Sequence, residues 1–130
     1  MKLTLILGLL IASQIPKNDP TGIWEATTGS KFELKLSGTD LKVRMVEGSN
    51  AKYVKYEVDL KNAEEQNSYK GTGYFIAKLQ NGKECRYDTD WQLVVVAANR
   101  IIGVVTGVTP DPDSCTPKEK STLQLDLKKN

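Results

Sequence analysis

Few residues of this chain combine the type and the spacing that catalysis or metal binding requires. Asp88 and Asp90 lie two positions apart in an extended segment, so their carboxylates share one face and could do acid–base work or bind calcium. Asp111 and Asp113, in a Pro-Asp-Pro-Asp run, could supply oxygen ligands to calcium. The first pair falls on the polar face of its segment, and Asp-Pro is common in turns. We therefore favour solvated carboxylates at both places.

The composition argues further against enzymatic chemistry. The 130 residues include no histidine, which removes the commonest general base and zinc ligand. No Gly-x-Ser-x-Gly motif is present either. We expect no catalytic residue, no metal and no cofactor, and predict that the protein is not an enzyme. The net charge of +2 carries no concentrated basic field, so we expect no nucleic-acid partner.

The two cysteines, Cys85 and Cys115, predict one disulfide bond. A Cys-x-x-Cys redox motif is absent, and two cysteines without histidine cannot complete a structural zinc site. An even pair is typical of an exported protein. The alternative is two buried thiols in a cytosolic protein.

The N-terminus has the order of a secretory signal peptide. Met1-Lys2 is positive, residues 3–12 are almost all apolar, and small and polar residues follow. An apolar run of about ten residues is too short to span a bilayer, which takes about 20. We predict a signal peptide over 1–12, an extended segment over 13–20 and one domain over 21–130, secreted or periplasmic, with no membrane span in the mature chain. A buried N-terminal strand is the alternative.

The domain reads as a series of strands whose apolar residues alternate with polar ones. This period of two, with one polar face to each strand, favours antiparallel pairing. Short connections favour hairpins between neighbours, and closure removes both exposed edges. We predict an all-β fold, an eight-stranded antiparallel up-and-down meander barrel. Its strands are expected near 22–28, 31–37, 40–46, 52–60, 69–80, 83–96, 100–108 and 120–128.

Two connections carry specific expectations. Asn81-Gly82 separates two strand-like runs, and this dipeptide favours a type I′ hairpin turn, in which both residues have positive φ. The segment 109–117 contains three prolines and predicts a loop. If the barrel is correct, this loop brings Cys115 toward Cys85 at one end of it.

A pair of glycines at 71 and 73 leaves two side chains absent on one strand face. The pair permits either a sharp bend or a space in which a ligand approaches the backbone. Inward-facing residues would line that space. The candidate ligand-binding residues are Trp24, Tyr56, Val58, Gly71, Gly73, Phe75, Tyr87, Trp91 and Leu93.

Gly22-x-Trp24 opens the first strand of the domain. This motif resembles the first-strand motif of the calycin superfamily, the lipocalins and avidin-like barrels. The resemblance implies an up-and-down barrel whose Trp24 closes one end under a basic residue from the last strand. Lys120, Lys128 and Lys129 are the candidates for that residue.

Three functions fit these features. The first is an exported, monomeric barrel that binds a small hydrophobic or aromatic ligand in its interior. The second is a secreted or periplasmic protease inhibitor, because the chain also resembles small bacterial eight-stranded barrels that insert an extended N-terminal segment into metalloproteases. Residues 13–20 would then be the inhibitory segment. The third is a structural domain of the cell envelope.

Overall fold

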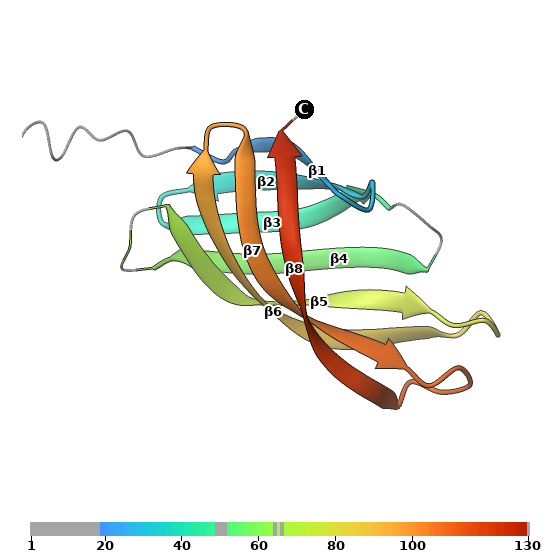
Figure 1. Cartoon of the computed structure of the whole chain (residues 1–130). Helices are drawn as coiled ribbons and strands as arrows, with labels where there is room; N and C mark the ends of the chain where they lie inside the picture. The colour runs from blue at the N-terminus through green and yellow to red at the C-terminus, as the bar shows by residue number, and fades with distance from the viewer. Residues whose placement is uncertain (1–18, 49–51, 64, 66, 130) are drawn as a thin grey trace, which may run out of the picture.

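The computed structural model describes residues 19–48, 52–63, 65 and 67–129. In this part of the chain, eight antiparallel strands follow one another in chain order and close into a barrel (Figure 1). The predicted fold class is confirmed. The expected signal peptide over 1–12, and all but Asp19 and Pro20 of segment 13–20, lie outside the described residues. The strands are β1 (Gly22–Ala26), β2 (Lys31–Ser37), β3 (Asp40–Glu47), β4 (Tyr53–Asn62), β5 (Ser68–Lys78), β6 (Glu84–Ala97), β7 (Arg100–Pro110) and β8 (Pro117–Lys129).

The predicted loop over 109–117 is too long. Thr109 pairs with Glu119 and Pro110 with Pro117, so β7 and β8 each continue into it and only 111–116 remains. Both prolines stand at a strand end, where a missing N–H removes little of the ladder.

The type I′ turn predicted at Asn81-Gly82 is wrong, although the hairpin is present. Gly82 has a φ of +87°, whereas Asn67 is the one non-glycine residue with positive φ in the described chain. The Asn81 side chain accepts a hydrogen bond from Lys83 N at 2.9 Å, and Gly82 N donates to Leu79 O at 2.9 Å. The side-chain bond favours a three-residue loop, in which only the last residue needs the left-handed region.

Side chains fill the barrel. Alternate residues of β6 from Cys85 to Val95 are buried, and those between them are exposed, as the period of two requires. Most buried residues form one large cluster, which includes Trp24, Leu34 and Leu93. A second cluster joins the end of β5 to the start of β6; it consists of Phe75, Ala77, Leu79, Cys85 and Tyr87.

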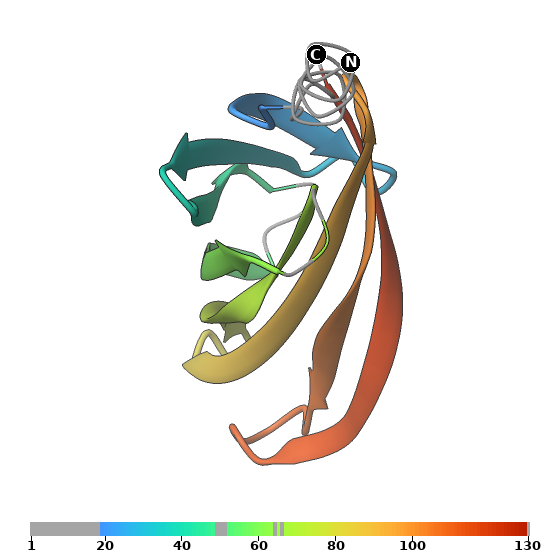
Figure 2. The same ribbon diagram turned by 90° about the vertical axis from the view of Figure 1, so that its left-hand side faces the viewer.

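The barrel closes over a short length. β1 meets β8 in three residue pairs: Trp24 with Lys129, Glu25 with Lys128 and Ala26 with Leu127. The ladder between β6 and β7 also ends early, at Trp91 and Val105. Beyond these points the β7–β8 hairpin curves away from the other strands, as Figure 2 shows. We call residues 106–122, which lie beyond both ladders, the β7–β8 arm.

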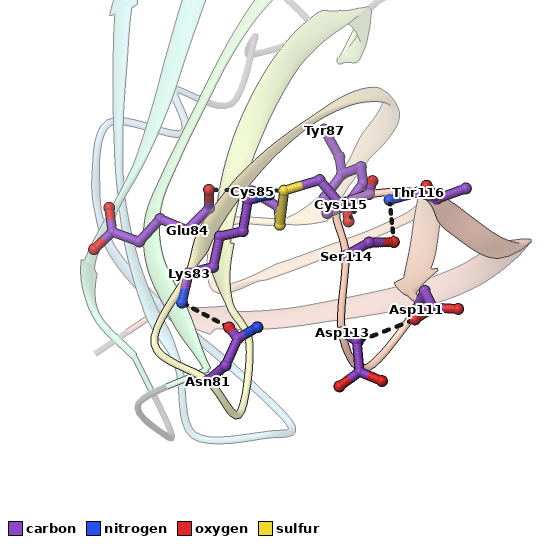
Figure 3. The surroundings of a disulfide bond; sticks show 10 residues. All are labelled: Asn81, Lys83, Glu84, Cys85, Tyr87, Asp111, Asp113, Ser114, Cys115 and Thr116. Atoms are coloured by element: carbon purple, nitrogen blue, oxygen red, sulfur yellow. Dashed lines mark hydrogen bonds between the residues drawn. A yellow bond between two sulfur atoms is a disulfide. The ribbon is translucent and has the colours of Figure 1, made fainter.

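The predicted disulfide is present and anchors this arm. Cys85 at the start of β6 bonds to Cys115 in the β7–β8 loop, with 5.3 Å between the Cα atoms (Figure 3). The Tyr87 hydroxyl adds a second tie by donating to Cys115 O at 2.9 Å. A hairpin alone is only marginally stable in water, so the arm depends on these two contacts, which hold it against β6.

Replacing both cysteines (Cys85→Ala with Cys115→Ala) should lower the free energy of unfolding by about 3–4 kcal/mol, since the bond removes loop entropy from the unfolded chain. Urea denaturation under non-reducing conditions measures this loss. Wild-type protein under reducing conditions is the control and should match the double variant. A double variant as stable as the oxidised wild type would contradict the anchoring role.

Candidate functional site

The structure brings four of the predicted ligand-binding residues together as a chain of rings. Tyr56 stacks on Phe75, with ring centroids 5.2 Å apart, and meets Trp91 edge-on at 5.5 Å. Phe75 then contacts Tyr87 at 5.5 Å. These rings connect the large cluster to the second one and occupy the barrel where the ligand was expected.

Two further aromatic residues belong to this chain of rings. Phe32 lies 5.7 Å from Trp91, and Tyr53 lies 5.6 Å from Phe75. The alternation of β2 identified Phe32 as inward-facing. Tyr53 had no such signal, because it stands where β4 begins.

The polar atoms among the rings already have partners within the protein. Trp91 Nε1 donates to the Tyr56 hydroxyl at 3.3 Å, and that hydroxyl lies 3.5 Å from Thr89 Oγ1. Thr89 in turn donates to Thr106 O at 2.8 Å, across the gap where β6 and β7 part. Burial raises the pKa of the Tyr56 phenol above its ordinary value. Within the described residues, the hydroxyl of Tyr69, also buried in the large cluster, is the one buried side-chain polar atom without a hydrogen-bond partner.

Trp24 packs in the large cluster together with Val58 and Leu93. Its Nε1 donates to Pro20 O at 2.8 Å, and Lys129 Nζ lies 5.8 Å from its ring centroid. Of the three lysines considered for this position, Lys129 thus lies over Trp24. Gly22 has a φ of +143°, a backbone conformation that side chains rarely adopt, which explains the glycine of the motif.

The two glycines of β5 serve a bend. A Cβ at Gly71 would lie 2.1 Å from Asp59 O, and one at Gly73 would lie 2.1 Å from Glu57 O. The backbone of β4 therefore occupies the space that the missing side chains leave. No ligand space is left at this pair, so of the two explanations considered the bend remains, with the backbone of β4 packed closely against it.

A groove opens at the end of the barrel that carries the disulfide. It has a volume of about 550 Å³ and lies between the end of β5 and the end of β7. Leu79, which belongs to the second cluster, is buried in its wall. The lining residues are Lys52, Lys78, Leu79, Gln80, Thr109, Pro110 and Pro112.

The charged residues that line this groove are all positive. Lys52 and Lys78 are its charged lining residues, and no lining residue is acidic. Lys78 N donates to Lys52 O at 2.7 Å, so the backbone holds both lysines at the same place. Apolar walls with two ammonium groups suit an apolar molecule that carries a negative charge. Sequence reasoning missed this groove because its residues come from three separate segments, at 52, 78–80 and 109–112.

The acidic candidates have structural explanations. Asp88 and Asp90 are exposed on the outer face of β6. Asp111 Oδ1 accepts a hydrogen bond from Asp113 N at 3.0 Å, which closes the turn of the β7–β8 loop. In the ranges that the structure describes, no group of three or more acidic, cysteine or histidine residues could hold a metal ion.

Comparison with known proteins finds no matching family model, no matching curated protein and no matching solved structure. The class of the protein therefore follows from its coordinates: an eight-stranded antiparallel closed barrel with one disulfide, a fold compatible with that of the calycins. Within the described residues, no helix has the length and apolar character to cross a membrane.

The buried phenol at Tyr56 predicts sensitivity to alkaline pH. Burial raises the pKa of the Tyr56 phenol in the folded protein. The stabilisation that this neutral phenol gives is therefore fully present below the ordinary tyrosine pKa of about 10, and it is lost as pH rises through the raised pKa. The free energy of unfolding should therefore fall as pH rises above about 10. In Tyr56→Phe the fall should be smaller, as urea titrations at each pH would show. An equal fall in both proteins would assign the effect to other groups.

Proposed function

We propose that this protein is an exported binding module that takes one small apolar or aromatic anion in the groove at the disulfide end of the barrel. The observation that carries the proposal is the groove itself, with Leu79 and two prolines in its wall and Lys52 and Lys78 as its charged residues. Its volume of about 550 Å³ lies within the range of small-molecule sites, roughly 300–1,000 Å³.

This proposal moves the ligand from the interior to the barrel end. An eight-stranded barrel is just wide enough either to be filled by side chains or to hold one small ligand. Here Tyr56, Phe75 and Trp91 pack against one another along the interior. The groove lies beside the second cluster, to which its lining residue Leu79 belongs, so an apolar ligand would bind next to this part of the core.

The resemblance to the calycins supports the same class of function. Gly22-x-Trp24 under Lys129, at the start of an eight-stranded meander, resembles the calycin arrangement. Lipocalins and avidin-like barrels bind small ligands, and the proposal places this chain among barrels of that kind.

The test uses 8-anilinonaphthalene-1-sulfonate, an aromatic anion whose fluorescence rises on binding. Replacing both groove lysines (Lys52→Gln with Lys78→Gln) should weaken its affinity about tenfold, since each exposed charge contact is worth up to about 1 kcal/mol. The matched control replaces two exposed lysines outside the groove, Lys42→Gln with Lys70→Gln, and should keep the wild-type affinity. Equal affinity in both double variants would reject the groove as the site.

One observation favours protease inhibition as a second candidate. The last residues of segment 13–20 are fastened to the barrel: Thr21 N donates to Asp19 Oδ1 at 2.9 Å, and Leu36 N donates to Thr21 Oγ1 at 3.0 Å. Hydrogen bonds from the backbone and side chain of Thr21 hold the pKa of the Asp19 carboxyl below its ordinary value. A fixed attachment of this kind is what an inhibitory N-terminal segment would need at its end.

Deleting residues 13–18 separates the candidates. An inhibitor should lose its inhibition of a metalloprotease such as thermolysin, while binding of the fluorescent anion stays unchanged. A structural envelope domain predicts that the intact protein has neither property. Inhibition that survives the deletion would rule out the N-terminal segment as its cause.

A further inference from the structure

The first part of β8 differs from every other strand in its burial. Residues 117–124 are all exposed, whereas the rest of β8 includes the buried Leu127. Strands that cover a core alternate between buried and exposed positions, as β6 does. Neither face of this part of β8 is therefore covered, and Leu123 leaves 50% of its surface exposed.

One edge of the same segment is also without a neighbouring strand. β1 pairs with Leu127, Lys128 and Lys129 alone, so in the described chain residues 117–126 pair with β7 only. Lys129 N donates to Asn99 O, on the β7 side. Because the backbone groups of an antiparallel strand alternate sides, those of Gln124, Thr122 and Lys120 point to the open edge.

The edge is already extended before any partner arrives. The β7–β8 arm is attached to the barrel at one end and to Cys85 through the disulfide at the other. Binding to a preformed strand avoids the entropy of ordering it. An edge of this kind is the receiving element in β-strand addition, where backbone hydrogen bonds provide affinity and alternate side chains provide specificity.

We propose that the open edge of β8 binds an extended peptide segment of a partner protein as an additional strand. The site is distinct from the anion groove, since none of the groove-lining residues belongs to β8. The proposal therefore does not rest on the proposed function.

The side chains of β8 define the partner. Leu123 and the half-buried Leu125 lie on the inner face and select apolar residues. Lys118 and Lys120 lie on the opposite face and select acidic residues near one end of the peptide. Lysines on an edge oppose indiscriminate pairing, so only a partner of complementary charge is accepted.

A second copy of this chain fits the edge less well. If two edges paired antiparallel about Thr122, Leu125 of one copy would face Glu119 of the other. That register places an apolar side chain opposite a carboxylate. A register shifted toward the start of β8 would bring Lys120 opposite its own copy, which is repulsive.

The experiment uses a fluorescein-labelled peptide, Thr-Val-Thr-Val-Thr-Thr-Glu-Lys-Glu with capped ends. Paired antiparallel, its valines face Leu125 and Leu123, and its glutamates face Lys120 and Lys118. We expect binding to the full-length oxidised protein by fluorescence anisotropy, and at least tenfold weaker binding of a scrambled peptide of the same composition. No binding, or equal binding of both peptides, overturns the proposal.

A matched pair of variants tests the edge itself. Thr122→Pro removes an N–H that faces the open edge and leaves the bonds to β7 in place, so binding should weaken about tenfold. Thr122→Ala keeps that N–H and should bind within about twofold of wild type. Urea denaturation confirms that both variants remain folded.

Two results would overturn the assignment. The first is equal binding by a folded Thr122→Pro variant. The second is a dimer of the wild-type protein in sedimentation equilibrium that Thr122→Pro converts to a monomer, because the edge would then belong to a second copy of the chain.

Discussion

The bond between Cys85 and Cys115 governs the half of the molecule in which binding is proposed. β6 and β7 part below Trp91 and Val105, and β1 has already ended, so the β7–β8 arm leaves the barrel with one backbone partner for each of its strands. The disulfide and the Tyr87 hydroxyl return the far end of the arm to β6. This attachment sets one wall of the groove and keeps the edge of β8 extended.

The interior explains why the proposed sites lie at the end and the edge. Large rings meet along the barrel, and their polar atoms bond to Thr89 and to one another. Gly71 and Gly73 let β4 and β5 approach so closely that no side chain fits between them. A barrel filled in this way has a stable core but little room for a ligand inside it. The proposed binding sites therefore lie on surfaces where strands end or lack a neighbouring strand.

The two proposed sites use opposite sides of the same hairpin. The end of β7 contributes Thr109 and Pro110 to the groove, while β8 presents its free edge on the other side. Both carry lysines at their margins, which favours anionic partners at each. Because the disulfide holds both strands, its reduction would affect the groove and the edge together, whereas a change in one lysine pair would affect a single site.

The local pattern of residues was enough to predict much of the fold from the sequence alone. Alternation in segments such as 31–37 and 84–97 reports a strand and its inner face, because successive side chains of a strand point to opposite sides. The disulfide was predicted from the even number of cysteines, and the order of the strands from the short connections between them. The turn type at Asn81 was predicted wrongly, because the hydrogen bond to its side chain favours a different turn from the one that the dipeptide indicates.

Tertiary structure alone decided which lysine covers Trp24, whether Gly71 and Gly73 open a space or permit a bend, and how much of β8 lacks a partner. These properties depend on the register between strands distant in sequence and on how far their ladders extend. A local sequence pattern contains neither the register nor the length of these ladders.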